Sequence, residues 1–258
     1  MNDFDPSVPN VARVYDALQD GKNNFGADRK VAEAIRTLAQ DGSRAAHDNR
    51  AFLSRAVRFL AGEAGISQFI DIGSGMPAAE NTHEIARSVR PETRVAYLDN
   101  DLVVLRHAAA IREKKRESIA LPGDLRKPRE ILGDPALRDF IDFGQPVAIM
   151  LLAVLHFIED PAAREAAGAL MREMPPGSYL VISHASADQA TPDEVSTISR
   201  IYDEAGTPIF LRTRDEITGF FAGLELAEPG VVNINAWRNP GHEPGRTIGY
   251  GGVAFKGA

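Results

Sequence analysis

The sequence predicts an α/β fold: a doubly wound, mostly parallel seven-stranded sheet with a C-terminal antiparallel hairpin and an N-terminal helical cap. Three observations support it. Short apolar runs alternate with helical patterns from about residue 66 onward, as in parallel sheets covered on both faces. Residues 1–64 carry helical patterns instead. The last two strand-like runs have no helix between them, so they should pair antiparallel. We therefore divide the chain into a cap, residues 1–64, and a core, residues 65–258.

Composition limits the classes of function. The 258 residues suit one large α/β domain or a core with a helical extension. Cysteine is absent, which excludes disulfides and thiolate metal sites and fits a reducing cytoplasm. The N-terminus does not resemble a signal peptide, and the longest apolar run, residues 147–155, is too short to cross a bilayer. The net charge of −7 argues against nucleic-acid binding. We expect a cytoplasmic protein without membrane or nucleic-acid partners, and a homodimer is compatible with the sequence.

Apolar residues at helical spacing predict three helices in the cap, over residues 11–18, 31–38 and 49–61. A loop rich in turn-forming residues, 20–26, separates the first two. We expect these helices to fold over a ligand as a lid, with Tyr15 and Asn24 facing it. The alternatives are that Tyr15 belongs to the core and that Asn24 lies in an exposed polar loop.

The core alternates strands and helices. Strands are predicted at residues 69–72, 94–98, 119–121, 146–152, 178–183, 231–234 and 249–255. Helices are predicted at residues 82–89, 102–115, 162–174, 192–205 and 214–221, with short helical pieces at 128–132 and 135–141. The run 146–152 is apolar throughout, as expected for a strand covered on both faces. The closing hairpin should lie at one edge of the sheet, with a long connection through Trp237.

The first strand ends in Asp71, followed by Gly73, Ser74 and Gly75. In open α/β sheets, ligands bind beyond the carboxyl ends of the strands. Glycines there let the backbone approach a ligand that a Cβ would repel. Asn81 and Glu84 have the spacing of a capping box, so the next helix should begin near residue 82. The turn is therefore longer than a tight pyrophosphate-binding turn.

The next strand ends supply complementary groups. Asp99 and Asn100 end the second strand, where a carboxylate can accept hydrogen bonds from both hydroxyls of a ribose. Asp124 and Leu125 follow the third, where Asp124 can meet the exocyclic amine of an adenine. Leu152 ends the fourth strand and offers a platform. The strand ends thus provide bare backbone, a ribose acceptor, a base acceptor and a platform for a nucleoside.

A dinucleotide is the competing ligand. Gly73, Gly75 and Ala78 match the pattern G-x-G-x-x-A, so an NAD(P)-dependent oxidoreductase is the alternative function. Asp71, however, would repel a pyrophosphate, and Pro77 disrupts the tight turn that aims a helix N-terminus at phosphate. An acidic turn suits a positively charged sulfonium better. The pattern therefore favours S-adenosylmethionine as the cofactor.

Several of these segments resemble a known class. Residues 69–75, Asp99, Gly123-Asp124 and residues 147–156 look like the successive motifs of class I S-adenosylmethionine-dependent methyltransferases. Three groups of segments resemble an actinobacterial S-adenosylmethionine methyltransferase family formerly catalogued as a domain of unknown function: residues 11–16 with 21–25 and 27–29, residues 71–77 with 81–84, and residues 97–101. The resemblance implies a Rossmann-like methyltransferase core and S-adenosylmethionine as cofactor, but no particular acceptor. Pro77 replaces the third glycine of the usual G-x-G-x-G turn.

Methyl transfer is an SN2 displacement that needs a general base only if the acceptor is a hydroxyl or a protonated amine. His156, after the fourth strand, and His184, at the end of the fifth, are the candidates for that catalytic role. The alternatives are a packing histidine under the cofactor for His156 and a surface residue for His184.

We expect the acceptor to be a small molecule. Side chains that could line its pocket are Tyr202, Arg212, Arg214 and Trp237. The histidines show no metal-ligand spacing, so no metal is predicted. A non-catalytic sensor that binds S-adenosylmethionine is a further alternative, because this reaction has no obligatory catalytic side chain.

Overall fold

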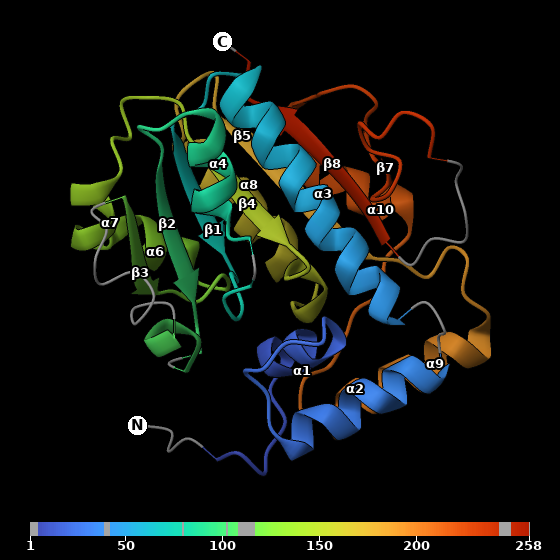
Figure 1. Ribbon diagram of the computed structural model, residues 1–258. Helices are drawn as coiled ribbons and strands as arrows, with labels where there is room; N and C mark the ends of the chain where they lie inside the picture. The colour runs from blue at the N-terminus through green and yellow to red at the C-terminus, as the bar shows by residue number, and fades with distance from the viewer. Residues whose placement is uncertain are drawn as a thin grey trace.

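The computed structural model describes residues 5–38, 42–78, 80–101, 103–107, 117–242 and 249–257. Its centre is one sheet, in the strand order β3-β2-β1-β4-β5-β8-β6, with β7 also paired to β8 (Figure 1). The strands are β1 Gln68–Ile72, β2 Arg94–Asp99, β3 Ser118–Pro122, β4 Ala148–Leu152, β5 Tyr179–Ala185, β6 Glu225–Leu226, β7 Val232–Asn233 and β8 Gly249–Phe255.

Strands β1 to β5 are parallel, and β8 runs antiparallel to β5, β6 and β7. The predicted mostly parallel sheet with a closing hairpin of β7 and β8 is therefore confirmed. Two details differ. β8 lies inside the sheet, between β5 and β6, instead of at an edge. The sheet also has an eighth strand, β6, whose two exposed residues are too few to show an alternating pattern.

Helices cover both faces of this sheet (Figure 1). They are α1 Val11–Leu18, α2 Gly26–Leu38, α3 Gly42–Gly62, α4 Thr82–Val89, α6 Pro128–Gly133, α7 Pro135–Phe140, α8 Ala162–Glu173, α9 Pro192–Glu204 and α10 Arg214–Thr218, with 3-10 turns η1 Leu155–Phe157 and η2 Gly219–Phe221. Of the helix predicted at 102–115, residues 103–107 are helical, and the remainder lies outside the described residues. α2 and α3 begin earlier than predicted.

Two apolar clusters on opposite faces of the sheet form the core. Alternate side chains of β4 divide between them, with Ile149 in one cluster and Met150 in the other, which is the two-residue period of a strand. One cluster includes Leu170 of α8, and the other includes Phe52 of α3. The doubly wound arrangement is thus built by strands that are apolar on both faces.

The N-terminal helices take two different positions. α1 and α2 pack with α9 in a third apolar cluster that includes Val14, Ile35 and Ile201. In Figure 1, α1 lies below the ends of β2 and β4. α3, in contrast, packs on the sheet with α4. Among the described helices, none has the length and apolar character needed to cross a bilayer. The lid role of the cap stays a prediction.

Candidate functional site

A cavity of about 800 Å³ lies between the carboxyl ends of the parallel strands and the helices α1, α3 and α9. Its size is within the range of small-molecule sites. Every residue predicted to bind the cofactor or to act in catalysis lines it, except Asn24: Tyr15, Asp71, Gly73, Ser74, Gly75, Asp99, Asn100, Asp124, Leu125, Leu152, His156 and His184. The strand ends therefore meet as the sequence predicts. Among the described residues, no cluster of three or more histidines and carboxylates has the geometry of a metal site.

Two glycines shape the turn after β1. Gly73 and Gly75 have φ angles of +72° and +63°, in the left-handed region that favours glycine. A Cβ on Gly73 would lie 2.5 Å from Cγ2 of Val154, whereas a Cβ on Gly75 would meet no atom within 4 Å. The turn thus packs against the loop after β4 on one side and leaves bare backbone facing the cavity on the other.

Asp99 joins the ends of β1 and β2. Its Oδ2 accepts the backbone N–H of Gly75 at 2.9 Å, and its Oδ1 accepts that of Asp101 at 3.0 Å. Burial raises the pKa of this carboxyl. Each carboxylate oxygen has a second lone pair, so Asp99 can still accept hydrogen bonds from a ligand in the cavity.

Asp71 anchors the other end of the same turn. The Thr82 hydroxyl donates to Oδ2 of this buried carboxylate at 2.7 Å. α4 begins at Thr82, as predicted, and the N–H of Asn81 donates to Glu84 at 2.8 Å in a capping box. The turn between β1 and α4 is therefore held at both ends, and Asp71 orients it as well as lining the cavity.

The end of β3 combines a turn with an apolar surface. Arg126 binds the Asp124 carboxylate through its guanidinium at 2.7 Å and its backbone N–H at 3.0 Å. These bonds lower the pKa of Asp124. The neighbouring Leu125 is buried and lines the cavity. Asp124 thus shapes the turn, and Leu125 offers a surface on which a planar base can lie.

The chain bends sharply after β4. Ala153 has a φ of +52°, a conformation that costs an L-residue about 1–2 kcal/mol. Its N–H donates to the carbonyl and hydroxyl oxygens of Ser183, both at 3.0 Å. The bend places Val154 against Gly73 and carries η1, with His156, over the cavity.

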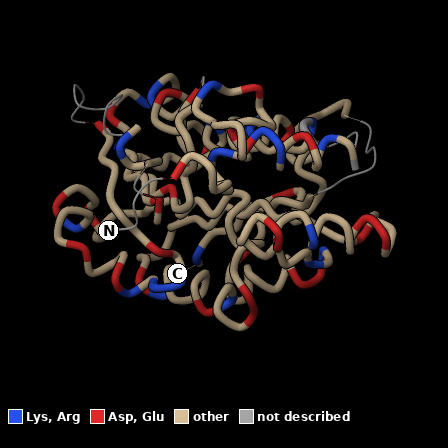
Figure 2. Tube along the Cα trace, turned by 90° about the horizontal axis from the view of Figure 1, so that it is seen from below, with Lys and Arg blue, Asp and Glu red and all other residues tan. Residues whose placement is uncertain are grey.

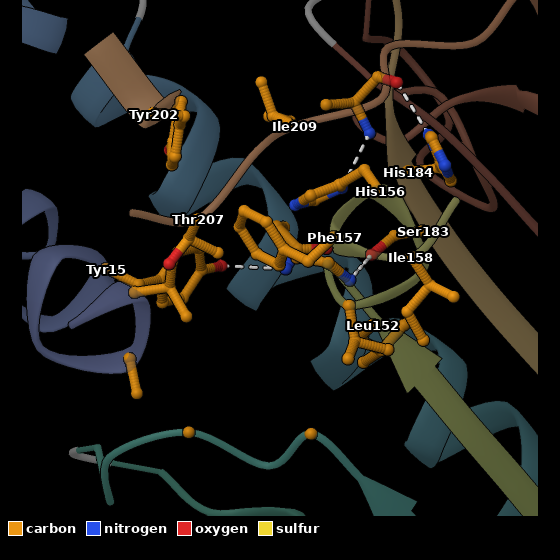
Figure 3. Close-up of a pocket in the computed structure, with 18 of the residues that line it drawn as sticks. Tyr15, Leu152, His156, Phe157, Ile158, Ser183, His184, Tyr202, Thr207 and Ile209 are labelled. Atoms are coloured by element: carbon orange, nitrogen blue, oxygen red, sulfur yellow. Dashed lines mark hydrogen bonds between the residues drawn. The ribbon is translucent and has the colours of Figure 1, made fainter. Parts of the chain in front are cut away.

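His156 presents a donor to the cavity. The N–H of Ala185 donates to Nδ1 of His156 at 3.2 Å, so in the neutral ring Nε2 carries the proton. Burial lowers the pKa of His156 well below its ordinary value. No described residue forms a hydrogen bond with Nε2, and in Figure 3 the ring extends toward the side of Tyr202 and Thr207. In this tautomer Nε2 donates a hydrogen bond, so the arrangement does not support the predicted role of His156 as a general base.

His184 has both ring nitrogens engaged. Arg212 donates to Nε2 at 2.7 Å, and Nδ1 donates to the carbonyl of Ala185 at 2.6 Å. Burial lowers the pKa of His184 to about 4. The predicted role as a base is therefore not supported, because the ring has no nitrogen left to take a proton from an acceptor.

Arg212 is a buried structural residue, not the predicted pocket residue. Besides His184, it donates to the carbonyls of Leu155 and Ile158 at 3.0 and 2.7 Å, and it pairs with Asp160 at 3.1 Å. These bonds fix the loop that carries His156.

Of the three other candidates for the acceptor pocket, one lines the cavity and two do not. Trp237 is fully buried in the core, where its ring meets Phe52 edge-on. Arg214 donates to the carbonyl of Val231 at 2.8 Å and is not among the lining residues. Tyr202 does line the cavity, as predicted. The aromatic and basic residue types alone did not distinguish core from pocket.

The two predicted lid residues also differ. The Tyr15 hydroxyl accepts from Nδ2 of Asn49 at 2.8 Å and lies in the cavity wall (Figure 3). The side-chain amide of Asn24 instead donates to Asp16 and to the carbonyl of Gly21, at 2.8 and 2.9 Å. Asn24 therefore stabilises the loop between α1 and α2, since that polar loop folds back on Asp16.

Sequence reasoning missed Asn10 and Phe157, both of which line the cavity. Asn10 accepts the N–H groups of Ala12 and Arg13 at the start of α1, and its amide donates to Asp101 beside Asp99. An asparagine directly before a helical pattern is an N-cap signal that could have identified Asn10. Phe157 carried no such signal.

The residues at the strand ends fit S-adenosylmethionine. Bare backbone at Gly75, a buried carboxylate at Asp99 and an apolar surface at Leu125 suit the parts of a nucleoside with an amino-acid tail. Asp71 adds negative charge beside the turn, which favours a sulfonium and disfavours a pyrophosphate. Figure 2 shows the molecule from below relative to Figure 1, and there the basic residues (blue) and the acidic residues (red) are interspersed along the chain.

The comparisons with known proteins point the same way. Residues 1–257 match the model of a family described as S-adenosyl methyltransferase. A provisionally assigned methyltransferase from Thermobifida fusca YX shares 41% identity, with a TM-score of 0.92 and coverage of 99% of this chain and 97% of that one. A DUF574 family protein from Streptomyces avermitilis shares 38% identity, with a TM-score of 0.92 and coverage of 98% and 99%.

Human N-acetylserotonin methyltransferase, solved with S-adenosylmethionine, shares the fold at 15% identity, with a TM-score of 0.53 and coverage of 95% of this chain and 59% of that one. A search of curated proteins finds no match.

Proposed function

We propose that this chain, which belongs to the S-adenosyl methyltransferase family, methylates a small molecule bound in the cavity. It is an S-adenosylmethionine-dependent methyltransferase. The observation that carries the proposal is the continuity of the cavity, which runs from the glycine turn after β1 to Tyr15 of α1 and Tyr202 of α9. A cofactor and a small acceptor can therefore lie in one space.

The cofactor half of the cavity is assigned residue by residue. Asp99 accepts hydrogen bonds from the ribose hydroxyls, beside Asn100, and the backbone of residues 73–75 holds the methionine portion. Leu125 and Asp124 border the adenine base of the cofactor, and Leu152 packs against the cofactor from the end of β4. Supporting this, Asp99 and Gly75 are joined by a 2.9 Å hydrogen bond at adjacent strand ends, and all of these residues line the cavity.

The acceptor is a small molecule and not a nucleic acid. The net charge of −7 opposes a polyanion. α1, α2 and α9 pack together in their own apolar cluster at the ends of the strands, which limits the space for a large substrate. We assign α1 and α2, within the cap of residues 1–64, the role of a lid.

Catalysis rests on alignment. The cofactor supplies an electrophilic methyl group on a positively charged sulfur. The protein's share is to hold the acceptor in line and exclude water, which together can lower a barrier by several kcal/mol. His156, held by Ala185 and by the loop that Arg212 fixes, orients the acceptor through its Nε2–H.

The test is a labelling experiment. The protein is incubated with methyl-labelled S-adenosylmethionine and an extract of the source cells, and the extract is then separated into ultrafiltrate and macromolecules. The proposal predicts label in the ultrafiltrate. Label in protein or RNA would assign a different acceptor, and cofactor binding without any labelled product would favour the non-catalytic sensor. Calorimetric titration with NAD provides the control for the oxidoreductase alternative, which requires tight NAD binding.

A further inference from the structure

The part of the cavity away from the strand ends, which we call the acceptor chamber, has neutral walls. It lies between α1, η1, α9 and the loop that follows α9, and the ring of His156 extends into it (Figure 3). Its lining comprises Tyr15, Phe157, Ile198, Tyr202, Thr207 and Ile209. The walls thus combine aromatic and aliphatic surface with hydroxyl groups.

Of the described charged residues that border this chamber, two are engaged with other groups and one is exposed to solvent. Arg50 donates to the backbone carbonyl of Glu80. Glu194 accepts the N–H of Thr191 at 2.8 Å in the capping box of α9, and Glu159 is exposed at the mouth. Burial of a charged ligand without a charged partner is costly, so these walls favour an uncharged one.

Three titratable side chains in the chamber, Tyr15, Tyr202 and His156, are neutral near pH 7. Burial raises the pKa of Tyr202 to about 12 and also raises the pKa of Tyr15. Burial lowers the pKa of His156, which faces His184 at 5.3 Å between ring centroids. Arg212, behind His184, pairs with Asp160. These three side chains therefore stay neutral across the physiological range.

A directional polar group in this chamber is the Nε2–H of His156, because Nδ1 is held by Ala185. A donor that stays unpaired in an apolar wall is costly, so a ligand with an oxygen at that position is preferred. The rings of Phe157 and Tyr202 lie 5.8 Å apart at 49°. Two such rings present faces and edges to a planar ligand.

We propose that the methyl acceptor is an uncharged, planar, largely apolar molecule with an oxygen atom that accepts a hydrogen bond from Nε2–H of His156. The S–CH3 bond of the cofactor breaks as a nucleophilic atom of this molecule bonds to the methyl group, S-adenosylhomocysteine leaves, and a proton displaced from that atom passes to water. This rests on the proposed function, since it identifies the acceptor chamber as the site of the second substrate. His156 is then a binding residue that sets the orientation of the acceptor, and phosphorylated, carboxylated or ammonium-bearing substrates are excluded.

The test uses four matched probes, titrated by calorimetry into the protein saturated with S-adenosylhomocysteine. Acetylnaphthalene carries an uncharged oxygen acceptor, naphthoate a carboxylate and naphthylmethylammonium a cation, and naphthalene has no polar group. We expect acetylnaphthalene to bind about tenfold more tightly than either charged probe. Preference for a charged probe, or failure of all probes to bind, overturns the acceptor class and leaves the proposed function standing. Failure of S-adenosylhomocysteine itself to bind defeats the proposed function.

Variants of His156 provide the second arm. His156→Phe should weaken acetylnaphthalene binding about tenfold and leave naphthalene unaffected, because only the hydrogen bond is lost. His156→Gln, which retains an N–H donor, should restore most of the affinity. Arg200→Ala, on the exposed side of α9, is the control and should leave the affinity for both probes unchanged. An equal loss of affinity for acetylnaphthalene and naphthalene in His156→Phe would show that the residue only packs, and would overturn its assigned role.

Discussion

Asp99 illustrates how one side chain can serve both fold and ligand. Its carboxylate accepts backbone N–H groups from the loops after β1 and β2, although burial raises its pKa. Those two bonds fix its position before any ligand binds. A side chain that is already held in place loses little conformational freedom when a ligand binds. A hydrogen bond from the ribose to Asp99 should therefore contribute to cofactor affinity with little entropic cost.

We therefore predict that Asp99→Ala weakens S-adenosylhomocysteine binding by about 1–3 kcal/mol, the cost of losing hydrogen bonds to a charged acceptor. Isothermal titration measures the change. Glu173→Ala, at the exposed end of α8, is the control and should bind normally. Unchanged affinity in folded Asp99→Ala protein would show that Asp99 does not hold the ribose.

The lowered pKa of buried His184 leads to a prediction of how stability depends on pH. Its pKa is lowered to about 4 by burial, against an ordinary value of 6.5. The unfolded chain therefore binds more protons between these values, so the free energy of unfolding falls as the pH drops from 6.5 toward 4. The loss from this residue reaches roughly 3 kcal/mol, and buried His156 acts in the same direction.

Urea unfolding at a series of pH values measures this dependence. His184→Gln should flatten the decline between pH 6.5 and 4, whereas the matched change at exposed His47, His47→Gln, should leave it intact. If wild-type stability does not fall across that interval, the buried neutral state of His184 is wrong.

At the scale of elements, α1 and α2 are joined by a buried ion pair. Nε of Arg13 lies 3.0 Å from Oδ2 of Asp28, and the two side chains are 3% and 0% exposed. Asp28 also accepts the N–H groups of Asn10 and Phe25, at 3.0 and 2.8 Å. The segments around residues 11–16 and 21–29 therefore hold α1 and α2 together.

Asp28→Ala should lower the free energy of unfolding by about 3–5 kcal/mol, because it leaves the Arg13 guanidinium buried without its partner. Chemical denaturation provides the value. The exposed pair of Arg36 and Asp20, also between the α1 to α2 loop and α2, is the matched control, and Asp20→Ala should cost no more than about 1 kcal/mol. Similar costs for the two variants would contradict the structural role given to Asp28.

At the scale of the molecule, the lid predicts a pattern of amide hydrogen exchange. α1 and α2 pack with α9 at the mouth of the cavity, whereas α8 lies in the apolar cluster on one face of the sheet. Binding of S-adenosylhomocysteine should slow exchange in residues 11–38 and leave residues 162–173 unchanged. Equal change in both segments, or none in the lid, would argue against closure over the cofactor.

The sequence predicted the parallel sheet and the cofactor side of the cavity because both depend on local signals. Apolar runs located the strands, and glycines or carboxylates directly after those runs, such as Gly75 and Asp99, fell at the shared edge. The hydrogen bonds of His156 and His184 do not support their predicted roles as bases, and the sequence could not show this because the partners, Ala185 for His156 and Arg212 for His184, are distant along the chain. Trp237, predicted to line the acceptor pocket, is buried in the core against Phe52, which is also distant in sequence.

The central claim is that the carboxylate of Asp99 and the backbone around Gly75 hold opposite halves of one cofactor molecule. A crystal structure with S-adenosylhomocysteine tests it most directly. We predict the ribose hydroxyls within hydrogen-bond distance of Asp99, the amino-acid tail beside residues 73–75 and the sulfur facing the acceptor chamber. A ligand bound elsewhere, or a ribose held by another carboxylate, would contradict the account.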